Sequence, residues 1–224
     1  MRPDGEPIRV IAEVKRRSPS AGELRADLDV AALASAYDQG GASAISVLTD
    51  GPHFGGSPED VADVRHATAL PVLRKDFTVC ANDVADARLM GASGVLLIVA
   101  ILTRAELRSL LEVAGLLGLT ALVEVHEARE QDLALTLGAL VVGVNQRDLA
   151  TFEVDTGRAA ALAGGFPSDV VTVAESGIAD ADAARGCAAH GYDAVLVGEA
   201  LVRSGDPAGA VAAMRAPDDA GVAA

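Results

Sequence analysis

The chain has 224 residues, enough to bury one sizeable core and within the range of a compact α/β barrel. Its formal net charge of -14 would repel nucleic acid and anionic membrane surfaces, which favours a small-molecule partner. The two cysteines, Cys80 and Cys187, are far apart, and no long apolar segment is present, which argues against a disulfide scaffold, a zinc site, a signal peptide or a membrane span. We therefore expect a cytoplasmic protein without a metal ion.

Short apolar runs recur along the chain and predict its strands. They begin near Val10, Ala44, Val72, Gly94, Ala121, Leu140, Val170 and Ala194. Many follow a glycine that ends a helix, and a continuous apolar run is typical of a buried parallel strand because helices cover its outer face. Eight such strands predict a single (β/α)₈ TIM barrel over residues 1–215, with a disordered tail over 216–224. A doubly wound open sheet would alternate in the same way, but no G-x-G-x-x-G follows the first strand.

Several predicted helices carry their own start signals. Asp29 precedes an apolar stripe, Ser57 is an N-cap before Pro58, and Thr103 with Glu106 forms a capping box. Between residues 103 and 118 the apolar side chains fall on one helical face, as expected for a helix that covers a sheet.

Charged residues interrupt the apolar strands near their C-terminal ends. Because side chains alternate along a strand, Glu13 and Lys15 share one face of the first strand, and Lys75 and Glu124 occupy the inward register of theirs. Buried charges are costly unless they are paired or serve a ligand, and the C-terminal ends of barrel strands form the active-site rim. The four side chains predict an active site there, or alternatively a structural salt-bridge network.

The ends of the last two strands have the composition of an anion site. Ser176 and Gly177 follow the seventh strand, and Gly198 and Glu199 follow the eighth, where a new helix begins. Backbone N–H groups at a helix N-terminus bind phosphate, and barrels commonly hold phosphate at loops seven and eight. Each glycine taken singly is also compatible with a simple turn.

Other polar residues have less specific patterns. Asn145 and Arg147 follow the sixth strand beside the same rim, although turn roles would also explain them. The four histidines, His53, His66, His126 and His190, have no metal-ligand spacing, and we expect loop or helix-end roles for them.

Eight short motifs, one at the end of each predicted strand, follow one another in order. They are IAEVKRRSPSAG at 11–22, SVLTDGPHFGGS at 46–57, LRKDF at 73–77, LLIV at 96–99, LVEVH at 122–126, NQRDL at 145–149, AESGI at 174–178 and VGEAL at 197–201. Together they resemble the indole-3-glycerol-phosphate synthase family. The resemblance implies ring closure of 1-(2-carboxyphenylamino)-1-deoxyribulose 5-phosphate to indole-3-glycerol phosphate in tryptophan biosynthesis, with loss of carbon dioxide and water. It implies no cofactor and no metal.

The resemblance also implies roles for the charged residues. Lys75 matches the general acid that protonates the ketone oxygen, and Lys15 would hold the carboxylate or share proton transfer. Glu124 is the first choice as base during the loss of water, while Glu13 and Asn145 would orient the reacting groups. We expect a lysine to serve as acid near neutral pH when neighbouring positive charge lowers its pKa, which Lys15 would supply.

Substrate-binding positions follow from the same motifs. The phosphate-binding positions are Ser18, Gly177, Gly198 and the backbone N–H of Glu199. The positions lining the anthranilate and ribulose parts of the substrate are Phe54, Leu96, Arg147 and Ser176. Phe54 would also fit a loop residue packed against the core.

Two alternatives stay open beside this hypothesis. A phosphoribosylanthranilate isomerase type of barrel would want a cysteine at the end of the first strand, where Glu13 and Lys15 stand. A non-catalytic barrel would keep the site residues, and its support is that the family's N-terminal helical extension is missing, since nine residues precede Val10. Without this extension we expect weaker substrate closure and phosphate affinity. The expected partner is a small phosphorylated molecule, and the expected state is a monomer or a weak homo-oligomer.

Overall fold

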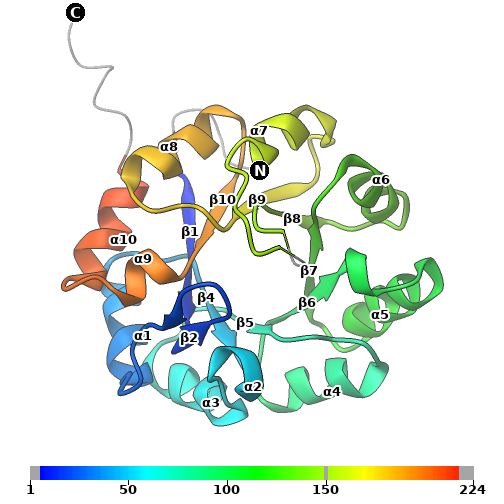
Figure 1. The fold of residues 1–224 in the computed structure, drawn as a ribbon. Coiled ribbons are helices and arrows are strands. Elements are labelled where there is room, and N and C mark those ends of the chain that lie inside the picture. The colour runs from blue at the N-terminus through cyan, green and yellow to red at the C-terminus, as the bar shows by residue number, and fades with distance from the viewer. Residues whose placement is uncertain (1–5, 149–150, 217–224) are drawn as a thin grey trace, which may run out of the picture.

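The computed structural model describes residues 6–148 and 151–216 of the chain. Eight parallel strands close into a barrel in the order β1-β10-β9-β8-β7-β6-β5-β4, with helices around them (Figure 1). The strands are β1 (Arg9–Val14), β4 (Ala44–Leu48), β5 (Val72–Lys75), β6 (Gly94–Ile98), β7 (Thr120–Val125), β8 (Val141–Asn145), β9 (Val171–Glu175) and β10 (Ala194–Val197). Each begins within one residue of its predicted start. The closed barrel confirms the predicted (β/α)₈ fold and excludes the open sheet.

A helix follows each barrel strand and covers the outside of the barrel. The covering helices are α1 (Val30–Gln39), α3 (Pro58–Ala67), α4 (Ala81–Leu89), α5 (Arg104–Leu116), α6 (Ala128–Thr136), α7 (Arg158–Leu162), α8 (Ala181–Ala189) and α10 (Pro207–Arg215). Shorter elements in the loops are β2 (Arg17–Ser18), β3 (Gly22–Glu23), α2 (Gly51–Phe54), η1 (Val99–Ile101), η2 (Ala163–Gly165) and α9 (Glu199–Val202).

The predicted helix starts are confirmed by their hydrogen bonds. The Asp29 carboxylate accepts the backbone N–H of Ala32 at 2.9 Å, and Ser57 caps α3. The Glu106 carboxylate accepts the backbone N–H of Thr103 at 2.7 Å, and the Thr103 hydroxyl accepts that of Glu106 at 3.3 Å. These bonds satisfy N–H groups that have no partner inside their helices.

Side-chain alternation divides the apolar residues of the strands into two layers. Val10, Ala12 and Val14 of β1 pack between the barrel and the helices, whereas Ile11 packs inside the barrel. The buried interior layer consists of Leu73, Leu96, Ile98, Leu122, Val173, Ala194 and Leu196. Because Glu13 shares the face of Ile11, it continues this interior surface towards the C-terminal end of the barrel.

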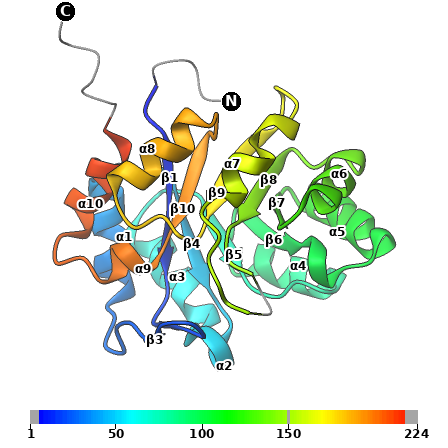
Figure 2. The same cartoon turned by 45° about the horizontal axis from the view of Figure 1, so that its top comes forward.

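Several loop elements gather at the C-terminal end of the strands, where β2, β3 and α2 extend from one end of the barrel (Figure 2). The Arg16 guanidinium binds the Asp60 carboxylate of α3 through two bonds of 2.5 and 2.8 Å, and it also donates to the Gly55 carbonyl at 3.1 Å. This bidentate pair holds the loop after β1 against the loop after β4. The loop that carries Ser18 therefore has a defined position over the barrel mouth.

The predicted tail covers 216–224, of which 217–224 lie outside the described residues. Within the described part of the chain, none of the helices combines the length and the apolar character needed to cross a membrane.

Candidate active site

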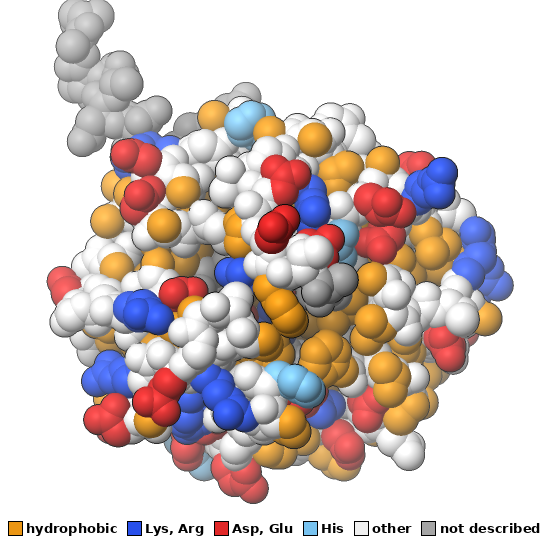
Figure 3. All heavy atoms as spheres, in the orientation of Figure 1, with side chains coloured by type: hydrophobic (Ala, Val, Ile, Leu, Met, Phe, Trp, Pro, Cys, Tyr) orange, Lys and Arg blue, Asp and Glu red, His pale blue; other side chains and the backbone are white. Residues whose placement is uncertain are grey.

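A cavity of about 450 Å³ opens at the C-terminal end of the barrel. Figure 3 shows the hollow at the centre of this face, with basic side chains inside it and apolar side chains along its border. The residues lining it include every position predicted from the sequence, namely Glu13, Lys15, Ser18, Phe54, Lys75, Leu96, Glu124, Asn145, Arg147, Ser176, Gly177, Gly198 and Glu199. The fold thus brings together residues that are spread over almost 190 positions of the sequence.

The first strand contributes an ion pair to the floor of the cavity. Lys15 Nζ lies 3.0 Å from Glu13 Oε1, and the hydroxyl of Ser46 on the neighbouring β4 donates to Glu13 Oε2 at 3.4 Å. Burial by itself would raise the pKa of Glu13, but the positive charges of Lys15 and Lys75 outweigh it, so this pKa is lowered. Glu13 is therefore a carboxylate that orients Lys15.

Lys75, at the end of β5, lies between two carboxylates of other strands. Its Nζ is 3.6 Å from Glu124 Oε2 and 3.8 Å from Glu175 Oε2. Burial alone would lower the pKa of Lys75, but the charges of Glu124, Glu175 and Glu13 raise it above its ordinary value. The expectation that Lys15 lowers the pKa of Lys75 is wrong, because Lys15 is neutralised by Glu13 and the carboxylates surround Lys75.

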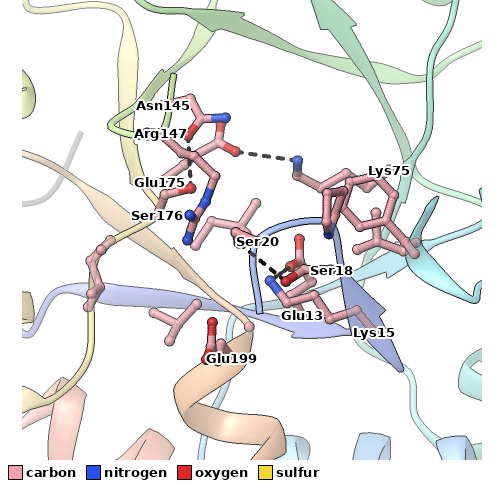
Figure 4. A pocket seen from close by; sticks show the side chains of 18 of the residues that line it. Glu13, Lys15, Ser18, Ser20, Lys75, Asn145, Arg147, Glu175, Ser176 and Glu199 are labelled. Atoms are coloured by element: carbon pink, nitrogen blue, oxygen red, sulfur yellow. Dashed lines mark hydrogen bonds and ion pairs between the residues drawn. The ribbon is translucent and has the colours of Figure 1, made fainter. Parts of the chain in front are cut away.

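Glu175 is a site residue that the sequence reasoning missed. Its side chain is almost fully buried, and it points into the cavity towards Lys75 (Figure 4). It lies in the inward register of β9 together with Val173, so the alternation that identified Glu124 on β7 also applies to it. The AESGI motif carries this signal in its glutamate, immediately before the serine and glycine that were predicted to bind substrate.

Glu124 and Glu175 form a pair of buried acids. Burial, followed by the negative charge of Glu124, raises the pKa of Glu175 to about 8 despite the opposing effect of Lys75. Among the described residues, neither carboxylate has a hydrogen-bond partner within standard geometry. Buried polar atoms without partners are costly, so these oxygens have capacity for the polar groups of a ligand.

The raised pKa of Glu175 predicts a pH-dependent stability. In the folded protein the Glu175 carboxyl keeps its proton up to about pH 8, whereas a glutamate in the unfolded chain loses it at about pH 4.3. The stability contributed by this proton is therefore fully present below the pKa of the unfolded state and is lost as the pH rises through the pKa of the folded state.

We expect Glu175→Gln to gain thermal stability relative to the unmodified protein between about pH 5 and about pH 9, by an amount on the order of 3 kcal/mol. Thermal unfolding of both proteins across this range measures it, and a difference that does not change with pH would contradict it.

Gly143 makes room for the carboxylate of Glu175. It pairs with Glu124 on the neighbouring β7, and a Cβ atom at this position would lie 2.0 Å from Glu175 Oε1. Any side chain at residue 143 would push this carboxylate away from Lys75, because 2.0 Å is far inside van der Waals contact.

Gly143→Ala is therefore expected to lower thermal stability by about 1–3 kcal/mol and to lower kcat by about tenfold. The matched control is Gly186→Ala on the exposed surface of α8, where a Cβ meets no atom within 4 Å. Because alanine is the better helix former, this control should gain about 0.5–1 kcal/mol and keep its kcat. Equal melting temperatures and equal kcat values for the two variants would disprove the role of Gly143.

Asn145 and Ser176 are joined across neighbouring strands. The Ser176 hydroxyl donates to Asn145 Oδ1 at 2.8 Å, and the backbone N–H of Arg147 donates to the same oxygen at 3.0 Å (Figure 4). These two bonds occupy the amide oxygen, which leaves the Nδ2 group to donate towards a ligand. Ser176 adopts φ 64°, a left-handed conformation that is uncommon outside glycine, and such strain is frequent at functional sites.

The predicted phosphate positions lie on the loops after β1, β9 and β10. Gly177 follows Ser176 with φ 72°, and Gly198 stands immediately before α9, so the Glu199 N–H is at the start of that helix. A Cβ atom at Gly198 would lie 2.5 Å from Glu13 Oε1 and 2.9 Å from Lys15 Nζ. Glycine is needed here because the chain passes directly against the ion pair.

Aromatic side chains lie at the border of the cavity. Phe54 lines it, which favours the binding role over a position in the core. Phe77 and Phe152 also line it while remaining 43% and 41% exposed, and the sequence analysis did not single them out. Exposed aromatic side chains beside a cavity provide an apolar surface on which a planar ring can pack.

Fold and site together place the chain among the (β/α)₈-barrel enzymes. These enzymes transfer protons to and from a small molecule that binds at the C-terminal mouth of the barrel. The family model described as "Indole-3-glycerol phosphate synthase" matches residues 2–214. The chain therefore belongs to the indole-3-glycerol phosphate synthase family. This membership excludes the isomerase alternative.

Curated relatives of the same description agree with this assignment. The indole-3-glycerol phosphate synthase of Mycobacterium ulcerans is 54% identical over 205 residues, which cover 92% of this chain and 75% of the relative. That of Micrococcus luteus is 53% identical over 215 residues, which cover 96% and 80%. That of Mycolicibacterium vanbaalenii is 55% identical over 205 residues, with coverages of 92% and 75%.

Two solved structures resemble the chain in fold alone. Thiamine phosphate pyrophosphorylase from Pyrococcus furiosus superposes with a TM-score of 0.69 at 20% identity, covering 93% of this chain and 94% of that one. N-acetylmannosamine-6-phosphate 2-epimerase from Clostridium perfringens also reaches 0.69, at 17% identity and with coverages of 89% and 90%.

Proposed function

We propose that the cavity residues carry out the family's reaction, in which 1-(2-carboxyphenylamino)-1-deoxyribulose 5-phosphate becomes indole-3-glycerol phosphate, carbon dioxide and water. The observation that carries this proposal is the placement of Lys75 between the buried carboxylates of Glu124 and Glu175. This arrangement supplies a cationic acid next to a base in a site shielded from water. The net charge of -14 disfavours a nucleic acid as the partner.

Substrate binding uses the two sides of the cavity. Figure 4 draws Glu199 on the side of α9, away from Asn145 and Lys75. The phosphate binds at the end formed by Ser18, Gly177, Gly198 and the N–H of Glu199, where backbone donors are available. The anthranilate ring packs on the apolar surface whose members are Phe54 and Leu96, with Arg147 and Ser176 beside it. This orientation brings the ketone towards the lysines.

Ring closure begins when the aromatic carbon that bears the carboxylate attacks the ketone carbon. Lys75 transfers a proton to the ketone oxygen, so the developing alkoxide becomes a hydroxyl as the carbon–carbon bond forms. Lys15, held by Glu13, pairs with the substrate carboxylate until that group leaves as carbon dioxide. The bonding electrons return to the ring and restore its aromaticity.

Loss of water completes the indole. The hydroxyl departs as water with a second proton, which Lys75 supplies once it has been reprotonated, and Glu124 accepts the proton that the new ring must release. The reaction therefore uses two protons and returns one, which balances the conversion of a carboxylate into neutral carbon dioxide. Glu124 is 3.6 Å from Lys75 and can return its proton to that residue for the next turnover.

A direct assay tests the proposed function. Purified protein incubated with the carboxyphenylamino-deoxyribulose phosphate is expected to produce the fluorescence of the indole product, in parallel with the release of carbon dioxide. The control is Lys75→Met, which retains the length of the side chain and lacks a transferable proton. Absence of product from the unmodified protein would disprove the proposal.

A further inference from the structure

A second chain of ionisable groups leads away from Glu124, starting at the carboxylate oxygen that does not pair with Lys75. Glu124 Oε1 lies 3.6 Å from Nε2 of His126, and Nδ1 of the same imidazole lies 3.4 Å from Glu130 Oε2. His126 is not among the residues that line the cavity. The two nitrogens of one ring thus connect the proposed base with a second carboxylate on α6.

The three side chains become more accessible with distance from the cavity. The exposed fraction of the side chain is 1% for Glu124, 13% for His126 and 18% for Glu130. The imidazole of His126 therefore lies between the more exposed Glu130 carboxylate and the buried Glu124. Imidazole suits this step because it accepts a proton at one nitrogen while releasing one from the other.

The charges around His126 come from several elements. Glu124 faces it from β7 and Glu130 from α6, the guanidinium of Arg158 on α7 acts on Glu130, and Lys75 of β5 lies beyond Glu124. Burial favours the neutral form of Glu130, but its contacts with the ring and the backbone N–H of His126 and the positive charge of Arg158 lower the pKa of that carboxyl.

If His126 and Glu130 had a purely structural role, it would be to cap the start of α6. There the backbone N–H of His126 donates to Glu130 Oε2 at 2.6 Å. That bond uses the main chain of residue 126 and does not need an imidazole, so it leaves the two ring contacts unexplained.

The proposed reaction has a use for such a connection. Each turnover of the proposed function consumes one proton from solvent, while the bound substrate occupies the mouth of the barrel. We propose that Glu130 and His126 form a relay that carries this proton from solvent to Glu124. A proton taken up from water by the Glu130 carboxylate passes to Nδ1 of His126, and the proton on Nε2 passes to Glu124 and from there to Lys75, 3.6 Å away. This restores Lys75 after ring closure, so that it can donate the second proton, and leaves Glu124 as the carboxylate that accepts the ring proton. The imidazole then returns to its initial tautomer. Contacts of 3.4–3.6 Å shorten to hydrogen bonds in many enzymes when the substrate binds.

His126→Gln tests the relay, because glutamine keeps polar atoms near both carboxylates and cannot carry a proton through a ring. We expect kcat to fall by about tenfold, KM to stay within about twofold, and the ratio of kcat in H₂O to that in D₂O to rise. His66→Gln, at an exposed position on α3, is the matched control and should leave all three quantities unchanged. A His126→Gln variant with the kcat and isotope ratio of the control would overturn the proposal.

Glu130→Gln provides an independent test if substitution of His126 prevents folding. Its amide oxygen can still accept the backbone N–H at the start of α6, so the cap persists while the carboxylate is lost. We expect kcat to fall by about threefold with an increased isotope ratio. An unchanged kcat would overturn the relay.

The relay rests on the proposed function, and a measurement without substrate separates the two. In ¹⁵N-labelled protein, the imidazole signals of His126 are assigned by their loss in His126→Gln, since the chain has 4 histidines. Glu124→Gln is expected to shift the Nε2 signal, because it removes the charge that this nitrogen faces. An unchanged signal overturns the relay, whereas lack of product formation by the unmodified protein overturns the proposed function.

Discussion

Replacing Lys75 with methionine is expected to lower kcat by about 10³-fold, which corresponds to about 4 kcal/mol of transition-state stabilisation. Lys75 is the cation that lies within 3.8 Å of both Glu124 and Glu175, and it is the proposed donor to the ketone oxygen. Without this proton the ring closure would have to generate an alkoxide beside two carboxylates. Methionine has a similar length and volume, so the cavity keeps its shape.

Steady-state kinetics with the carboxyphenylamino-deoxyribulose phosphate measures this effect. Product binding is the control, because the phosphate positions after β9 and β10 are independent of residue 75, and the dissociation constant of indole-3-glycerol phosphate should change by less than about threefold. A Lys75→Met protein with more than about a tenth of the original kcat would remove Lys75 from the mechanism.

Replacing Glu124 with glutamine is expected to lower kcat by about 10²-fold or more, with KM nearly unchanged. Glutamine retains the shape of the side chain and its place in the buried interior, but it cannot accept the proton released during the loss of water. Because ring closure and decarboxylation precede that step, carbon dioxide release should continue for one turnover while the indole product is delayed.

Rapid mixing that follows carbon dioxide and indole fluorescence separately distinguishes these steps. Glu127→Gln is the matched control, since Glu127 is an exposed residue three positions further along the chain at the start of α6. It should retain the original kcat. Indole formation in Glu124→Gln at the rate of this control would eliminate Glu124 as the base.

Much of the site could be predicted because local rules decide which way a residue faces. Apolar runs separated by helix signals indicated eight strands, and the period of two along β1 and β7 put Glu13, Lys15 and Glu124 on the inner face. Parallel strands in a barrel end at the same rim, so inward residues near strand ends meet there. These rules led to residues that all line one cavity.

The same rules do not specify which inward residues touch. Lys15 was expected to act on Lys75, yet it pairs with Glu13, while Lys75 pairs with Glu124 and Glu175. On one side of the barrel 4 strands separate β5 from β10, so the residues of these two strands come together only after the barrel has closed. Distances across a barrel depend on the stagger and tilt of all its strands, which no local pattern encodes.

The amino-acid sequence alone determined the barrel, the end at which chemistry takes place and the residue types present there, because periodicity and composition act over a few neighbouring positions. The tertiary structure decided the partners. It placed Glu175 against Lys75, used Gly143 to make room for that carboxylate, and set His126 behind Glu124. Contacts between distant segments, and the burial that shifts a pKa, exist only once the barrel has closed and excluded water from its interior.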